Sequence, residues 1–157
     1  MKMEKEKKIK ILYIDDEVNN LTSFKATFRR EFRIYLAESA AEGLEIVKTK
    51  DIEIVISDQR MPNMTGVEFF EKLTVEYPEP IRILLTGYSD IDAVIGAINK
   101  GRVYHYITKP WDERYLRNII RNSYEIYRLR EENKKLFEEL TQSNQQLEFL
   151  IRQQLLS

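Results

Sequence analysis

Five short runs of apolar and β-branched residues recur along the chain, and longer segments of helical period separate them. The runs are largely continuous rather than alternating, which is typical of parallel strands covered on both faces. The repeated order of strand and helix therefore predicts an α/β fold, with one parallel sheet and helices on both of its sides. The expected strands are residues 9–14, 32–37, 52–57, 81–86 and 103–107.

Several of the intervening helices have recognisable N-terminal signals. Ser39, Thr65 and Ser89 each precede an acidic residue three positions later, the pattern of a capping box, with Asp in place of Glu in the last case. The segment from 18 to about 30 fills the first gap between strands, and Asp112 is a candidate N-cap for the last helix.

The composition narrows the chemistry that such a fold can carry. The 157 residues include no cysteine and one histidine, which excludes disulfides, thiolate metal sites and sites built from several histidines. With 25 basic and 26 acidic side chains the net charge is −1, so no overall field favours nucleic acid. No apolar run is long enough for a signal peptide or a membrane span. We expect a cytoplasmic protein without direct contact to nucleic acid or membrane.

Polar side chains stand where the expected strands end. Asp15 and Asp16 end the first strand, Asp58 ends the third, Thr86 ends the fourth and Lys109 follows the fifth. Because the carboxyl ends of parallel strands meet at one edge of an open sheet, we expect these residues to gather there. Three carboxylates raise one another's pKa unless a cation holds them, and a site without Cys or several His favours a hard cation such as Mg²⁺. A metal, an ammonium and a hydroxyl around Asp58 would make a phosphoryl-transfer site with Asp58 as nucleophile.

The stretches YIDDE, SDQRMP, LLTGYSD and YHYITKPW together resemble the response-regulator receiver domains of two-component signalling, over about residues 8 to 125. The resemblance implies a flavodoxin-like sheet of five parallel strands in the order 2-1-3-4-5. It also implies a phosphoacceptor in a phosphorelay rather than an enzyme, a domain that promotes only its own phosphorylation and dephosphorylation. Asp58 would receive the phosphoryl group from a sensor histidine kinase or a phosphotransfer protein, with Mg²⁺ as the cofactor.

The same resemblance assigns roles to individual residues. The implied metal ligands are Asp15, Asp16, Asp58 and the backbone carbonyl of Arg60. Thr86 and Lys109 would contact the phosphoryl group, and Thr86 would form a switch pair with Tyr106. The Lys109–Pro110 bond is expected to be cis. Two large residues at positions that vary within the family, Arg60 and Tyr88, would tune the lifetime of the phosphate.

Three further residues near these motifs have structural interpretations. His105 is expected to be an edge-strand residue that points away from the site. Trp111 is expected to pack at the start of the last helix, with partner contact as the alternative. Glu17 is expected to line the rim of the site or to cap a helix, without binding the metal directly.

The chain changes character after the last expected strand. Roughly 45 residues from about Asp112 to the end contain neither Gly nor Pro. A continuous helix of that length would reach on the order of 65 Å. A domain of about 110 residues has a radius of gyration of only about 13 Å, so the helix must project. We therefore expect a receiver domain at 1–125 and a coiled-coil signalling helix at 126–157 that continues the last receiver helix.

The tail also has a heptad pattern, with apolar residues at spacings of three and four over about five heptads. The expected seam consists of Ile119, Ile126, Leu129, Asn133, Leu136, Leu140, Leu147 and Leu150. A buried Asn at an a position, here Asn133, favours a two-stranded parallel coil in fixed register, whereas Ser143 and Gln154 weaken the seam. We expect a parallel homodimer. The alternative is a helix that packs back on its own domain, as its first turns are expected to do through Leu116 and Ile120.

These patterns lead to one expected function and two alternatives. Phosphorylation of Asp58 would shift a two-state equilibrium that the coiled coil relays to an effector absent from this chain. The first alternative is a phosphohydrolase with an aspartyl nucleophile, a class that places a second Asp two residues after the nucleophile on the first strand, where this chain has Glu17 after Asp15. The second is a dimerising adaptor whose acidic site is silent.

Overall fold

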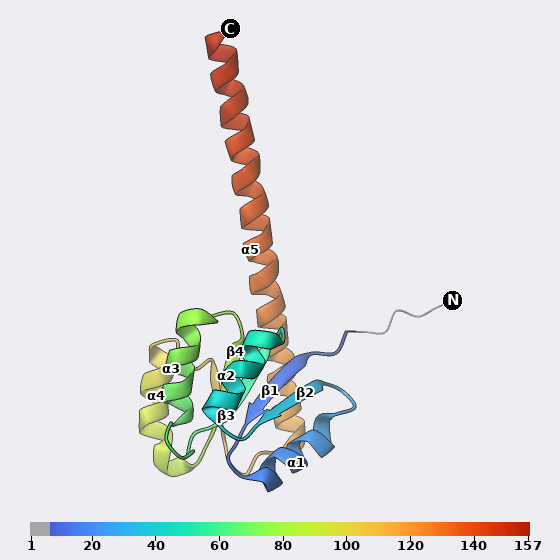
Figure 1. Ribbon diagram of the computed structural model, residues 1–157, viewed down its shortest axis with the longest axis vertical. Helices are drawn as coiled ribbons and strands as arrows, with labels where there is room; N and C mark the ends of the chain where they lie inside the picture. Colours follow the sequence, from blue (N-terminus) through green and yellow to red (C-terminus); the bar gives the residue numbers. More distant parts are fainter. Residues whose placement is uncertain (1–6) are drawn as a thin grey trace, which may run out of the picture.

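One sheet of five parallel strands organises the protein. The computed structural model describes residues 7–157, apart from the side chain of Tyr88. The strands lie in the order β2-β1-β3-β4-β5 (Figure 1), which confirms the predicted fold class and strand order. Their bounds are β1 (Lys10–Ile14), β2 (Arg33–Ala37), β3 (Ile54–Asp58), β4 (Ile81–Thr86) and β5 (His105–Thr108).

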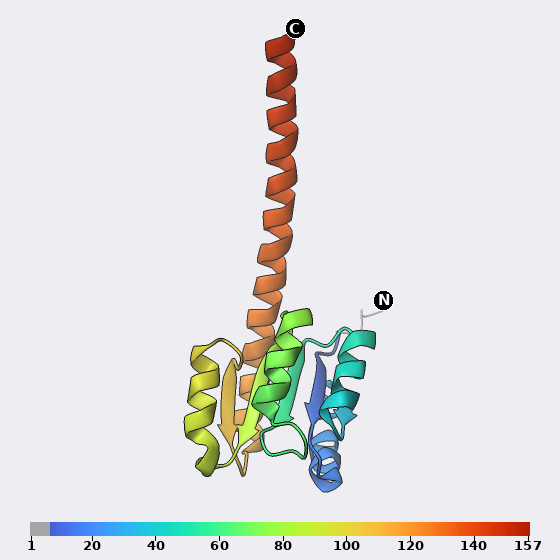
Figure 2. The ribbon, with the colours of Figure 1, turned by 60° about the vertical axis from the view of Figure 1, so that its left-hand side comes forward.

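Helices cover both faces of this sheet. Their bounds are α1 (Val18–Phe28), α2 (Ala40–Thr49), α3 (Gly66–Glu76), the short 3₁₀ helix η1 (Tyr88–Asp90), α4 (Ile91–Asn99) and α5 (Glu113–Leu156). The first part of α5 and α1 cover one face, and α2, α3 and α4 cover the other (Figure 2). Successive residues of a strand face opposite sides, so Ile11 and Tyr13 lie in the core beneath α1 and α5, whereas Leu12 and Ile14 lie in the other core.

The strand ends matter more for function than the strand starts, and they were predicted more accurately. Asp58 and Thr86 are the last residues of β3 and β4, as expected. Two expected strands begin two residues later than predicted, because Ile52 and Val103 are buried in the core without belonging to a strand. Apolar residues indicate that a segment is buried, but the residue at which a strand begins depends on its register with the neighbouring strand.

Two of the three expected helix N-caps are formed at the predicted positions, each through the N-cap side-chain bond of a capping box. The side-chain oxygens of Ser39 and Thr65 accept hydrogen bonds from the backbone N–H groups three residues later, at 3.2 Å in both cases. The third expectation is wrong, because α4 has Asp90 rather than Ser89 as its N-cap. The carboxylate of Asp90 makes no cap hydrogen bond either, since it pairs with Arg60. Asp112 is the N-cap of α5, also without a side-chain cap bond.

The beginning of α5 is anchored on the domain. Leu116 and Ile120 are fully buried, which confirms the expected inward residues. Trp111 packs against the rings of Phe24 and Phe28 with centroids 6.2 and 5.8 Å away, which confirms its packing role. The carboxylate of Glu31, just after α1, adds a polar clamp by accepting hydrogen bonds from two arginines of α5, Arg117 and Arg121.

The rest of α5 leaves the domain as a single straight helix (Figures 1 and 2). Ile126 and Tyr127 still pack against the core, and Lys134 lies 4.0 Å from Glu79, so contacts with the domain extend past residue 125. Every residue from 132 onward is exposed, which agrees with the predicted projection. Among the described residues, none of the helices is both long and apolar enough to cross a membrane.

Candidate functional site

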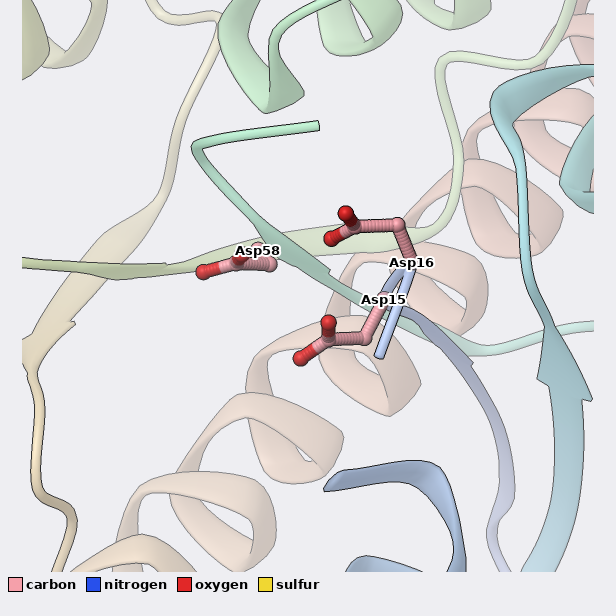
Figure 3. Close-up of side chains that lie close together, drawn as sticks. All are labelled: Asp15, Asp16 and Asp58. Carbon is pink, nitrogen blue, oxygen red and sulfur yellow. The ribbon is translucent and has the colours of Figure 1, made fainter. Parts of the chain in front are cut away.

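Three carboxylates converge at the carboxyl edge of the sheet. Asp15 and Asp16 come directly after β1, and Asp58 ends the neighbouring β3 (Figure 3). One carboxylate oxygen from each of the three lies within 4.8 Å of the others. Asp15 and Asp58 are buried, whereas Asp16 is exposed. The strand order therefore brings together acids that lie more than 40 residues apart in the sequence, as predicted.

The carboxylate of Asp15 is held by three donors. Oδ2 accepts hydrogen bonds from the hydroxyl of Tyr13 at 2.7 Å and from Nδ2 of Asn20 at 3.1 Å. Oδ1 accepts a bond from the backbone N–H of Glu17 at 2.9 Å. Burial, and then the hydrogen bond to Asp15, raise the pKa of Tyr13, so the phenol stays protonated and acts as a donor. Glu17 is the exposed N-cap residue of α1, the second of its two expected places, although its side chain makes no cap hydrogen bond.

The carboxylate of Asp58 lies between other acidic side chains and a lysine ammonium. Nζ of Lys109 lies 2.5 Å from Oδ1. Burial raises the pKa of Asp58, the Lys109 ammonium opposes that rise, and the charges of Asp15 and Asp16 add to it. A second cation at the site would relieve this repulsion among the acids.

The loop after Asp58 is packed closely against the start of α3. A Cβ at Gly66 would lie 2.7 Å from the carbonyl oxygen of Asp58 and 2.6 Å from Leu84, so only glycine allows this approach. The side chain of Gln59 accepts a hydrogen bond from the backbone N–H of Val67. The start of α3 is thus bonded to the residue that follows Asp58, which fixes the loop between them.

The other predicted site residues lie at the end of β4, in β5 and directly after β5. Thr86 is fully buried at the end of β4, and its hydroxyl donates to the carbonyl of Gly87 at 3.2 Å. The backbone N–H of Lys109 donates to the carbonyl of Thr86 at 2.9 Å, which ties the two loops together, and the Lys109–Pro110 bond is cis as expected. The register pairs Thr86 with Thr108, so Tyr106, two residues earlier on β5, lies on the same sheet face as Thr86.

Arg60, in the loop after β3, is bound to the segment that follows β4. Its Nε donates to the carboxylate of Asp90 at 2.9 Å and its Nη2 donates to Ser89 Oγ at 3.0 Å. The hydrogen bond and the charge of Asp90 raise the pKa of the Arg60 guanidinium, and the charge of Asp58 adds a smaller rise. The side chain of Tyr88, the other residue expected to tune the phosphate lifetime, lies outside the described residues.

His105 lies apart from the acids, as predicted. It begins the edge strand β5, and its Nε2 is 3.4 Å from the hydroxyl of Tyr115 in α5. Burial lowers the pKa of His105.

Sequence reasoning missed three residues that shape the site. Tyr13 had an available signal, since residues i and i+2 of a strand point to the same face and Asp15 follows at that distance. Asn20 and Asp90 had no such signal in the sequence, because the contact that each makes depends on the positions of loops and helices in the fold.

The comparisons with known proteins agree with this geometry. A family model described as "response regulator receiver domain" matches residues 11–121, so the chain is a member of that family. The chain is 33% identical over 138 residues to the hydrogenase transcriptional regulatory protein HoxA of Cupriavidus necator, covering 88% of this chain and 29% of HoxA. It is 34% identical over 127 residues to the C4-dicarboxylate transport transcriptional regulatory protein DctD of Rhizobium meliloti, covering 80% of this chain and 27% of DctD.

Solved structures show the same fold. A response regulator receiver domain protein from Clostridium thermocellum has a TM-score of 0.73 and 31% identity, with 77% of this chain and 98% of that chain covered. A structure described as adenylate cyclase from Rhodopirellula baltica has a TM-score of 0.81 and 27% identity, with 83% and 98% covered. The chain spans less than a third of the length of the curated relatives it matches.

Membership of the family has two consequences for the site. Receiver domains interact with a histidine kinase or a phosphotransfer partner, and they bind Mg²⁺ at an acidic pocket. The residues present fit such an ion, because the donors are carboxylate oxygens from three residues within 4.8 Å and the described part of the chain offers no cluster of softer ligands there.

Proposed function

We propose that the chain is a phosphoacceptor module of two-component signalling in which Asp58 receives the phosphoryl group. The observation that carries the proposal is the place of Asp58 between the ammonium of Lys109 and the carboxylates of Asp15 and Asp16. A carboxylate flanked by a fixed cation and by a candidate metal site is suited to attack phosphorus and to remain as an acyl phosphate.

The transfer follows from this arrangement. A carboxylate oxygen of Asp58 forms a bond to phosphorus while the bond from phosphorus to the donor breaks, and the donor's histidine nitrogen or carboxylate leaves with the electron pair. Lys109 and the hydroxyl of Thr86 would then contact the phosphoryl oxygens. Mg²⁺ would neutralise charge on the phosphoryl group. Its proposed ligands are Asp15, Asp16, Asp58 and the backbone carbonyl of Arg60.

We expect the conformational signal to pass from the β4–β5 side of the site to α5. Thr86 would turn from the carbonyl of Gly87 toward the phosphoryl group, and Tyr106 on the same sheet face would respond. The long helix would carry the change through a parallel coiled-coil dimer, with residues 1–125 as receiver and 126–157 as signalling helix, to an effector in the cytoplasm. The exposed leucines on α5, between 54% and 62% exposed from Leu129 to Leu150, support the dimer.

Labelling with acetyl phosphate tests the proposal. In the presence of Mg²⁺, intact mass should rise by one phosphoryl group per chain. Asp58→Asn should remain folded, because the amide is nearly isosteric, and should take up no label. Asp51→Asn, which removes an exposed carboxylate away from the site, should label like the wild-type protein. Full labelling of Asp58→Asn would assign the nucleophile to another residue, and sustained hydrolysis of simple phosphate monoesters would favour a phosphohydrolase instead.

A further inference from the structure

The hydrogen bonds of Asp15 leave one open position on its carboxylate. An ionised carboxylate offers about four acceptor positions, two on each oxygen. The hydroxyl of Tyr13 and Nδ2 of Asn20 both occupy Oδ2, and the backbone N–H of Glu17 occupies one position of Oδ1. A cation at this site can therefore bind Asp15 through the remaining position of Oδ1, with a single contact.

We propose that Tyr13 is a specificity-determining residue of the metal site, because its hydroxyl keeps Asp15 monodentate and so favours Mg²⁺ over Ca²⁺. The inference rests on the proposed function, in which Asp15 is a metal ligand. Mg²⁺ demands near-octahedral geometry at short distances, which single carboxylate contacts satisfy, whereas Ca²⁺ accepts bidentate carboxylates and six to eight ligands. A carboxylate whose second oxygen is already occupied disfavours the larger ion.

The position of Tyr13 makes its hydroxyl a fixed element of the site. The residue lies on β1, 1% exposed, with its ring 4.5 Å from that of Phe24. Tyr13 and Asp15 point to the same face because they are two residues apart along the strand direction. The 2.7 Å bond between them joins two buried groups, so rotation of the phenol away from Asp15 would leave both without that partner.

Calorimetric titration of the whole chain with Mg²⁺ alone and with Ca²⁺ alone tests this role. Tyr13→Phe removes only the hydroxyl, and we expect the ratio of Mg²⁺ to Ca²⁺ affinity to fall by about tenfold, which is comparable to the loss of metal affinity when a residue that orients a ligand is removed. Asn20→Ala removes the other donor to Oδ2 from the surface of α1 and should shift the ratio in the same direction, so the test does not depend on the folding of Tyr13→Phe. Tyr35→Phe, the same change in the half-buried tyrosine of β2, should leave the ratio unchanged.

The outcomes separate this inference from the proposed function. A purely structural role for Tyr13 would lower the melting temperature without changing the ratio of the two affinities. An unchanged ratio in both Tyr13→Phe and Asn20→Ala, with normal Mg²⁺ binding by the wild-type protein, would overturn the inference and leave the metal site intact. Asp16→Ala should lose most Mg²⁺ affinity, and if it binds like the wild type, the placement of the metal is wrong and the role of Tyr13 falls with it.

Discussion

Asp15 and Ser123 are both fully buried, yet their hydrogen bonding is opposite. The three donors around Asp15 replace the water that its carboxylate loses, so the charge can be buried where the function needs it. Ser123 lies on the inner side of α5, and its hydroxyl has no partner in the described part of the chain. An unpaired buried hydroxyl costs about 1–3 kcal/mol, and nothing in the site uses it.

Ser123→Ala should therefore stabilise the fold. The change removes the unpaired hydroxyl and raises helix propensity, and we expect about 1 kcal/mol of added stability. Urea unfolding should give a higher midpoint with the same dependence on denaturant. Ser23→Ala in α1 is the control, because Ser23 is exposed and gains only the helix propensity. A lower midpoint for Ser123→Ala would show that the hydroxyl is paired in solution.

The segment between β4 and α4 is held by a residue from another loop. Asp90 and Ser89 both bind the guanidinium of Arg60, whose own position is two residues after Asp58. Thr86, at the start of the same segment, would move when Asp58 is phosphorylated. The pair of Arg60 and Asp90 thus links the phosphoacceptor loop to the element that responds to it, although 73% exposure of the arginine side chain keeps the pair weak.

Asp90→Ala should lengthen the life of the phosphorylated state. Without Asp90, the guanidinium of Arg60 is free to pair with the phosphoryl oxygens and to hinder the attacking water, and we expect dephosphorylation to slow by about two- to fivefold. Loss of label by intact mass after removal of the donor gives the rate. In the double variant Arg60→Ala with Asp90→Ala the gain should disappear. If the double variant keeps the slower rate, Arg60 is not its cause.

The elements that sequence predicts well are those whose signals are local. Ser39 and Thr65 cap helices through bonds that span three residues, and both were found. Ser89 has the same local pattern but is not the N-cap, because its hydroxyl accepts a hydrogen bond from Arg60, a residue of a distant loop. The acids at the strand ends were placed correctly because a parallel sheet brings its carboxyl ends to one edge whatever the details of packing. The spacing of Tyr13 and Asp15 indicates that both lie on one face of the strand, but the hydrogen bond between them could be identified only from the side-chain geometry of the fold.

At the scale of the molecule, helix α5 lies in two environments, the surface of the domain and then the solvent. The first turns of α5 are bound to the domain by Leu116, Ile120 and the clamp on Glu31. Partial burial opposes ionisation of Glu31, but the hydrogen bonds from Arg121 and Arg117 outweigh it and lower the pKa of this carboxyl. Ile119 and Ile126 of the expected seam pack partly against the domain's own core, so the part of the seam that is free for a partner begins at Leu129.

The free part of the seam should make the protein a parallel dimer at micromolar concentration. Leu140→Lys combined with Leu147→Lys should give a monomer, because both positions lie on the a side of the seam and would place like charges opposite each other while losing apolar burial. Gln142→Lys with Phe149→Lys adds the same charge at outward c positions and should remain dimeric. Asn133→Leu should raise stability while loosening the register or the number of chains, since a buried Asn specifies both at a cost in stability.

Sedimentation equilibrium on these four proteins distinguishes the possible assemblies, and labelling of Asp58 should persist in all of them because the site lies on the globular part. The acids and Lys109 are far along the chain from Leu140 and make their contacts within the domain. A wild-type monomer at every accessible concentration would mean that the leucines from Leu129 to Leu150 do not pair with a second copy, and the relay through a coiled coil would then have to be abandoned. A dimer that survives the two seam lysines but not the two outward ones would place the contact on the opposite face of the helix, where Phe149 is 60% exposed.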